Sequence, residues 1–279
     1  MSKYLIGIGC SFTSGQGSVP RKFHARYGDG VYKRAPIAMI DRVESDHSWV
    51  TNLADRIGYI PLNFGSKGRG NRSAAKELYM NQLDSTSEKI VVFCLSGLSR
   101  FDFLQPKGEL VDHHFQPVFP DLSGNKLWQG YAEFGNSWQQ EAVDCILNIA
   151  EVQNWCKVNN AKLLLVSAFD LRIGREEFRS MIIPESKKYL ADIVDWDLMV
   201  KPKGNRTLME YLVREQEPSL SEDELQPIYS NEYFNRYKIP GFAEGLITPC
   251  GHPSNQGHIH ISSLLEDEIM RRGYVTQGK

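Results

Sequence analysis

The chain has 279 residues, a formal net charge of −2 at pH 7, 41% hydrophobic residues and 24% charged residues. These values exclude a disordered chain, and they exclude an overall charge that would attract nucleic acid or an anionic membrane. No apolar run approaches the roughly 20 residues that cross a bilayer, so we expect no membrane span.

The five cysteines are odd in number and show no paired Cys-x-x-Cys spacing. This pattern favours reduced thiols over a disulfide framework or a zinc site. The apolar stretch near the amino terminus is too short for a signal peptide. We therefore expect a soluble, cytoplasmic protein that uses neither a metal nor a cofactor.

Predicted strands and helices alternate along the chain. The strands are short and nearly continuously apolar, which is typical of strands buried on both faces. The helices carry apolar residues at helical spacing. This alternation predicts a parallel sheet covered by helices on both faces. In chain order, the predicted elements are a strand at Tyr4–Ile8, a helix from Asp46 or Ser48 to about Ile57, a strand at Ile60–Phe64, a helix at Ser73–Leu83, a strand at Lys89–Leu95, a helix at Gln140–Asn159, a strand at Lys162–Ser167 and a helix at Asn255–Arg272.

Three segments do not follow this pattern. Residues 18–44 are polar and are predicted to form a loop, and residues 101–136 read as a long loop or lid. The aromatic residues of that lid would either line a sugar or acyl pocket or cover the sheet. Residues 171–246 contain five prolines among short helical patterns, and we interpret them as an insertion or subdomain. We expect one domain over residues 1–279.

Three short segments with chemical potential lie where they can reach the carboxyl ends of the strands, the edge at which parallel sheets bind ligands. Ser11 lies in a turn between glycines directly after the first strand. Gly68 belongs to a glycine-rich stretch after the second strand, and could offer a backbone N–H to an oxyanion. His252 precedes a proline just before the last helix, and would suit the role of general base for a serine.

These segments resemble the SGNH (GDSL-type) hydrolases. The family's first block, Gly-Asp-Ser-x-x-x-Gly, is matched at all but one fixed position by Gly9–Gly15. Its second block, an Asn followed five residues later by a glycine, is matched by Asn63 and Gly68. Its last block is matched by His252-Pro253 and by the Gly-His at 257–258. The sequence is most similar to divergent, often phage-encoded members, and a phage-encoded protein would be associated with the virion.

The resemblance implies a flavodoxin-like, three-layer α/β/α fold and acyl transfer through a serine nucleophile. Ser11 would attack an ester carbonyl while His252 accepts its proton. The backbone N–H groups of Ser11 and Gly68 would bind the oxyanion. The family's third block, Gly-x-Asn-Asp, is absent, because Ser96–Arg100 follows the third strand instead. Asn71 and Arg100 are the candidates for a side-chain oxyanion donor.

Two other departures concern the triad. Cys10 stands where the family has an Asp beside the nucleophile, a change we expect to be tolerated. Pro249 stands where the triad acid is expected, three residues before His252. Either Ser11 and His252 act as a dyad, or Asp170 or Glu244 supplies the acid, or the site is weakened.

The expected substrate is a small-molecule or carbohydrate ester, such as an O-acetyl group on a sugar. The alternative is a catalytically silent binding module of the same fold that recognises glycans in a viral assembly. A nucleotide-binding oxidoreductase is disfavoured because Phe12 and Asn63 stand where its fingerprint needs a glycine and an acid. We interpret His258 and His260 as structural, since residues two apart on a helix face different ways. The oligomeric state is left open.

Overall fold

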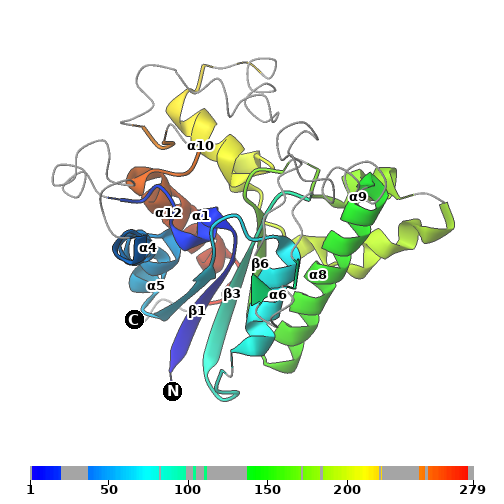
Figure 1. Ribbon diagram of the computed structural model, residues 1–279, viewed down its shortest axis with the longest axis horizontal. Helices are drawn as coiled ribbons and strands as arrows, with labels where there is room; N and C mark the ends of the chain where they lie inside the picture. Colours follow the sequence, from blue (N-terminus) through cyan, green and yellow to red (C-terminus); the bar gives the residue numbers. More distant parts are fainter. Residues whose placement is uncertain are drawn as a thin grey trace.

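The computed structural model describes residues 2–19, 37–81, 83–98, 103–104, 110–111, 137–170, 172–182, 185–219, 221, 245–248 and 251–275. A central sheet runs through the molecule, with helices on either side of it (Figure 1).

The sheet has four parallel strands in the order β2-β1-β3-β6. They are β1 (Lys3–Gly9), β2 (Ile60–Gly65), β3 (Glu88–Leu95) and β6 (Lys162–Ser167). All four predicted strands are therefore confirmed, within two residues at each end. The chain passes from β2, on one side of β1, to β3 on the other, so the strand order reverses at β1. Such a reversal opens a crevice at the carboxyl ends of the strands.

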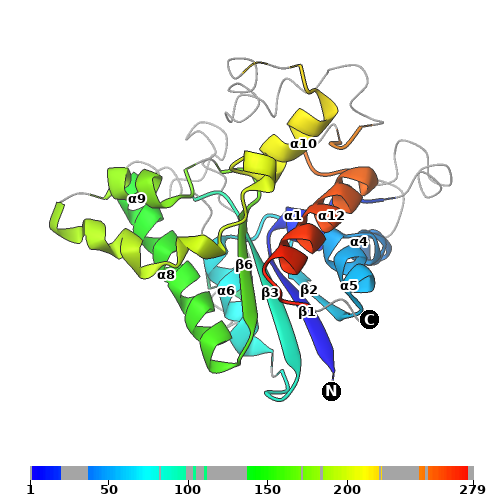
Figure 2. The same cartoon turned by 180° about the vertical axis from the view of Figure 1, so that it is seen from behind.

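Helices cover both faces of this sheet, which confirms the predicted three-layer architecture (Figures 1 and 2). Alternate side chains of each strand enter opposite cores. Leu5 of β1 packs in one cluster and its neighbour Ile6 in the other. The first face is covered by α5 (Trp49–Ile57), α10 (Leu208–Gln216) and α12 (Asn255–Arg271), and the second by α6 (Asn71–Met80), α8 (Trp138–Val158) and α9 (Arg175–Met181).

Capping residues explain where two of these helices begin and end. The Ser48 side chain accepts a hydrogen bond from the Thr51 N–H at the start of α5, and Gly58 ends that helix in the left-handed conformation, with φ 71°. Ser254 accepts from the Gly257 N–H at the start of α12 in the same way. These local signals are visible in the sequence, so the two helices were predictable to within about two residues.

Two predicted boundaries are corrected. Residues 37–46 of the segment expected to be a loop form the helix α4 (Ile37–Asp46). Its buried side chains are few, Ile40 and Glu44 among them, which gives a weak periodic signal. Helix α6 begins at Asn71 rather than Ser73, because Gly70 takes the extended N-cap conformation. The rest of the 18–44 segment lies outside the described residues from position 20 to position 36.

The segment 171–246 packs on the sheet where it is described. The Val200 N–H bonds to the Leu165 carbonyl of β6 at 2.8 Å, and the Met209 N–H bonds to the Ala168 carbonyl at 3.0 Å. Leu208 and Leu212 of α10 are fully buried in the core under α5 and α12. Besides α9 and α10, this segment holds the 3-10 helices η3 (Glu185–Ile193), η4 (Trp196–Leu198) and η5 (Pro202–Gly204).

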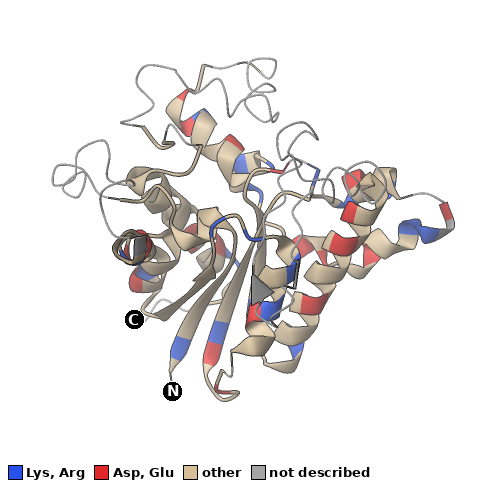
Figure 3. Ribbon diagram, viewed as in Figure 1, with Lys and Arg blue, Asp and Glu red and all other residues tan. Residues whose placement is uncertain are grey.

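In the segment predicted as a loop or lid, the described residues form a short antiparallel pair, β4 (Phe103–Leu104) and β5 (Leu110–Val111). The aromatic residues named for its pocket otherwise lie outside the described part of the chain. Figure 3 shows charges of both signs spread over the helices, while the strands are charged mainly at the amino-terminal ends of β1 and β3. Within the described ranges, no helix is long and apolar enough to cross a membrane. Four of the cysteines are free and buried, and Cys250 lies outside the described residues.

Candidate active site

Ser11 lies at the carboxyl end of the central strand. Strand β1 ends at Gly9, Cys10 forms the N-cap, and Ser11 is the first residue of the short helix α1 (Ser11–Ser14). Gly9 has φ 152°, and a Cβ there would lie 2.5 Å from the Cys94 carbonyl oxygen, so the turn requires glycine. The start of a helix leaves backbone N–H groups without intrahelical acceptors. The Ser11 side chain is therefore held beside donors that could stabilise negative charge.

His252 meets Ser11 from the other end of the chain. Its Nε2 lies 2.9 Å from Ser11 Oγ, although 241 positions separate the two residues. The backbone of His252 is fixed by Thr248, whose N–H and hydroxyl both donate to the His252 carbonyl at 2.8 and 2.9 Å. The imidazole packs against the Phe12 ring, with 5.9 Å between ring centroids. Folding thus places a hydroxyl and an imidazole within proton-transfer distance.

Gly17, which the sequence did not single out, allows this approach. Its φ is +93°, and a Cβ at this position would lie 2.5 Å from the Pro253 carbonyl oxygen and 3.3 Å from His252 Cβ. Any larger residue would push the histidine turn away from the segment that follows the nucleophile. The available signal was a second glycine two residues after Gly15, without a helix or strand pattern around it.

His258 is structural, as the sequence indicated. It is fully buried at the start of α12, where Nδ1 accepts a hydrogen bond from the Trp49 N–H at 3.2 Å and Nε2 faces the Gln16 carbonyl at 3.5 Å. Burial lowers the pKa of His258 to about 3, so the ring is neutral at physiological pH. This histidine ties α12 to the start of α5 and to the turn after Ser11.

The second sequence block shapes a loop beside Ser11. Asn63 accepts a hydrogen bond from the Gly65 N–H at 3.0 Å and donates to Ser48 Oγ at 3.1 Å, which ties the end of β2 to the cap of α5. The Ser66 N–H then bonds to the Gly9 carbonyl at 3.2 Å. Gly68 follows with φ +68°, a conformation that favours glycine. The glycine-rich loop therefore lies along the turn that carries the nucleophile.

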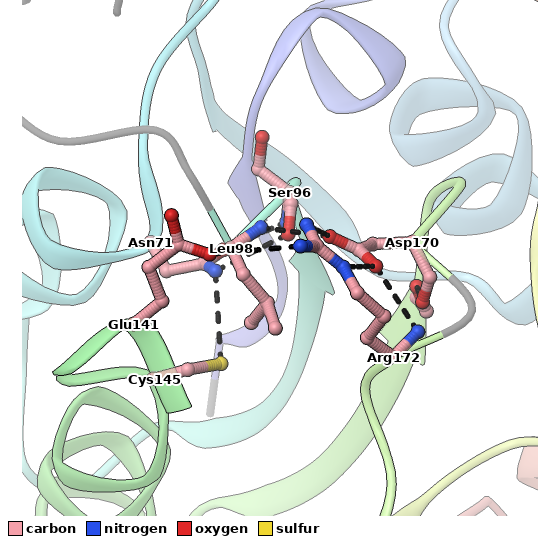
Figure 4. A network of polar contacts seen from close by, with 8 residues as sticks. Asn71, Ser96, Leu98, Glu141, Cys145, Asp170 and Arg172 are labelled. Carbon is pink, nitrogen blue, oxygen red and sulfur yellow. Dashed lines mark hydrogen bonds and ion pairs between the residues drawn. The ribbon is translucent and has the colours of Figure 1, made fainter. Parts of the chain in front are cut away.

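Asn71 has a different set of partners from those expected of an oxyanion donor. Its Oδ1 accepts from the Ser96 N–H at 2.7 Å, while Nδ2 donates to the Ser96 carbonyl at 3.2 Å and contacts Cys145 Sγ at 3.7 Å (Figure 4). Both amide hydrogens are thus engaged in holding the chain that follows β3. A role for Asn71 in binding an oxyanion stays a prediction that these contacts do not support.

Asp170 lies in the same network and is also engaged. Its Oδ2 accepts from the Leu98 N–H at 2.9 Å, and its two oxygens pair with Arg172 at 2.6 and 2.8 Å (Figure 4). The guanidinium of Arg172 stacks on Trp138 at 4.3 Å. These contacts fix the loops after β3 and β6, and no hydrogen bond to His252 is among those described for Asp170. Arg100, Glu244 and Pro249 lie outside the residues that the structure describes.

Solved structures with similar chains were found. One, assigned to the lipolytic G-D-S-L family, from Desulfitobacterium hafniense DCB-2, is 12% identical with a TM-score of 0.41, covering 95% of this chain and 98% of its own. A lipase/acylhydrolase from Enterococcus faecalis is 13% identical with a TM-score of 0.36, covering 100% of both chains. A member of the lipolytic protein G-D-S-L family from Veillonella parvula DSM 2008 is 10% identical with a TM-score of 0.35, covering 97% of this chain and 100% of its own. No family model and no curated protein matches the chain.

A polar cavity of about 330 Å³ lies beside the glycine-rich loop. Apart from Gly65, every lining side chain is polar or charged. Lys67 Nζ lies 2.7 Å from Asp41 Oδ1 and 2.7 Å from Glu44 Oε2. Burial lowers the pKa of Lys67, but its bonds to Asp41 and Glu44 outweigh burial and raise the pKa above its ordinary value. The buried Glu44 also accepts from the Gly17 N–H at 3.2 Å, so one ion pair fixes the turn after Ser11 and the loop before Gly68.

Two further results bound the site. A larger hollow of about 470 Å³ lies over α10 and α12, but neither Ser11 nor His252 lines it. Among the described residues, no group of three His, Cys, Asp or Glu side chains is placed to hold a metal ion. The arrangement at the end of β1 is therefore a serine beside an imidazole, with backbone donors close by, and its chemistry is that of nucleophilic attack by a hydroxyl.

Proposed function

We propose that this protein is a serine hydrolase that cleaves ester bonds through an acyl-enzyme intermediate. The observation that carries the proposal is the 2.9 Å contact between Ser11 Oγ and His252 Nε2. A hydroxyl is a weak nucleophile at its ordinary pKa, and an adjacent imidazole activates it by accepting its proton. In this proposal Nε2 is the unprotonated nitrogen of the ring and Nδ1 carries the hydrogen.

Acylation begins when Ser11 Oγ attacks the ester carbonyl carbon and transfers its proton to His252 Nε2. The carbonyl π electrons move to the oxygen, and the backbone N–H groups of Ser11 and Gly68 donate to this oxyanion. The intermediate then collapses. The bond to the alcohol oxygen breaks, the alcohol leaves with the proton from Nε2, and the acyl group stays on Ser11.

Deacylation repeats these steps with water. His252 Nε2 accepts a proton from a water molecule whose oxygen attacks the acyl carbon, and collapse of the second oxyanion returns the proton to Ser11 and releases a carboxylic acid. The group that pairs with the imidazole stays a prediction. Since the described contacts of Asp170 are with Arg172 and Leu98, the remaining alternatives are Glu244 or a Ser–His dyad.

For the substrate we propose an ester of a polar alcohol, such as an O-acetylated sugar. The polar cavity supports this, because Ser14 lines it and lies one helical turn from Ser11. Its volume is near the lower end of the ~300–1,000 Å³ range of small-molecule sites, which suits a single sugar ring better than a long chain. A polar lining also disfavours a long acyl chain, which would gain little from leaving water there.

Labelling with a fluorophosphonate, followed by peptide mapping, tests the proposal. We expect an adduct on Ser11 that disappears in His252→Ala, and turnover of p-nitrophenyl acetate that falls by about 10⁴-fold or more in Ser11→Ala. Ser180→Ala removes an exposed serine on α9 and serves as the matched control. An adduct on another serine would overturn the assignment. Equal hydrolysis by the wild type and by Ser11→Ala would favour the silent binding module instead.

A further inference from the structure

Ser96 carries a hydroxyl that the folded chain leaves without a partner. It is the first residue after β3, and its side chain is 1% exposed. Its Oγ is buried and makes no hydrogen bond within the part of the chain that the structure describes. Buried hydroxyls are nearly always bonded, because an unpaired one has lost its water and gained nothing in exchange. An orphan of this kind in a functional region suggests a partner that arrives later.

The backbone around this hydroxyl is fixed. The Asn71 amide bonds both to the N–H of Ser96, at 2.7 Å, and to its carbonyl, at 3.2 Å. Two residues further on, the Leu98 N–H bonds to the Asp170 carboxylate at 2.9 Å. In Figure 4 the Ser96 side chain points away from the dashed bonds to Asn71 and Asp170. The saturated network thus holds Ser96 in place while leaving its hydroxyl unused.

Strand register places Ser96 next to the nucleophile. Strands β1 and β3 are parallel neighbours, and Gly9 is paired with Cys94. Ser11 and Ser96 each lie two residues beyond that pair, so both leave the sheet at the same edge. Adjacent strands are about 4.8 Å apart, which puts the two residues on either side of the crevice where the strand order reverses.

From these observations we infer that the Ser96 hydroxyl donates a hydrogen bond to the substrate oxyanion, as the side-chain donor that joins the N–H groups of Ser11 and Gly68. The inference rests on the proposed function. The hydroxyl exchanges no proton in the reaction. It donates to the oxygen only while that oxygen carries charge, so its contribution appears in the transition state and not in substrate binding. This assigns to Ser96 the role for which Asn71 and Arg100 were the sequence candidates.

Steady-state kinetics of Ser96→Ala, with p-nitrophenyl acetate, test the inference together with thermal denaturation. We expect kcat to fall by about 10²-fold with KM unchanged, as for loss of one oxyanion donor. We also expect Tm to stay the same or rise, because the substitution removes a buried polar group that has no partner. Ser96→Cys, which keeps a weak S–H donor, should lie between alanine and the wild type in kcat.

Ser262→Ala is the matched control. Ser262 is also fully buried, but its hydroxyl donates to the Ile259 carbonyl at 2.8 Å on α12. Its loss should lower Tm and leave kcat unchanged, the reverse of the pattern expected at Ser96.

The outcomes separate this inference from the proposed function. Wild-type kcat in a Ser96→Ala protein that still labels on Ser11 would overturn the role of Ser96 and leave the esterase proposal standing. A fall in both kcat and Tm, or a rise in KM alone, would also overturn it, because either result indicates a structural or ground-state role. Absence of any Ser11 adduct in the wild type would overturn both.

Discussion

Two polar regions lie along the carboxyl edge of the sheet, and they use their hydrogen bonds differently. Around Asn71 and Asp170, the amide and both carboxylate oxygens are engaged with backbone groups and with Arg172. Around Ser11, the hydroxyl and the His252 imidazole face each other in a crevice beside helix-start N–H groups. The comparison teaches that residue type does not distinguish a scaffold from a reactive site. What distinguishes them is which polar groups the fold leaves available to a substrate.

Removing the central member of the scaffold should break this contrast most strongly. In Asn71→Ala, the N–H and the carbonyl of Ser96 lose their partner in a buried place, and we expect the free energy of unfolding to fall by about 3 kcal/mol. Urea denaturation measures it. Asn154→Ala, at an exposed position on α8, is the control and should change stability by less than about 0.5 kcal/mol. If Asn71→Ala unfolded at the wild-type urea concentration, the network would not be the scaffold described.

His258 sharpens the contrast, because it is an imidazole that the fold has made structural. Its folded pKa of about 3 lies below the unfolded value of 6.5, so the unfolded state binds the proton first. Stability should therefore be complete above pH 6.5 and fall as the pH drops toward 3. The slope is at most about 1.4 kcal/mol per pH unit, or about 2 kcal/mol by pH 5.

Denaturation across this pH range, in the wild type and in His258→Gln, measures the effect. The variant should be less stable at pH 7 but should lose less stability on acidification. His260→Gln, on the same helix, leaves His258 in place and is the matched control. Parallel curves for wild type and His258→Gln would show that His258 does not cause the acid sensitivity.

The smallest expected effect concerns Glu44, which ties the reactive region to its support. Glu44→Gln removes the charge that pairs with Lys67 while keeping an acceptor for the Gly17 N–H. Lys67 is partly exposed and still pairs with Asp41, so we expect a loss of about 1 kcal/mol in unfolding free energy. Because Lys67 precedes Gly68, kcat should fall more than stability alone explains. Asp55→Asn, an exposed acid on α5, is the control, and an unchanged kcat in Glu44→Gln would separate the ion pair from the oxyanion loop.

Local patterns determined much of the architecture. The four apolar runs predict the four strands, because a strand buried on both faces needs apolar residues at successive positions. Ser48 and Gly58 mark the ends of α5, since capping involves only neighbouring backbone groups. Ser11, Gly68 and His252 were found from their positions at strand ends and before the last helix. In contrast, α4 was missed, because few of its side chains are buried and its apolar periodicity is weak.

The sequence by itself thus determined the layers, the strand order to be expected of alternating elements, and the residues of the reactive pair. Only the tertiary structure decided which polar groups are consumed. The amides of Asn71 and the carboxylate of Asp170 meet partners 25 to 74 positions away, and Ser96 Oγ meets none among the described residues. The physical reason is that hydrophobic periodicity is written in adjacent residues, whereas the satisfaction of a buried hydrogen bond depends on groups that only folding brings together.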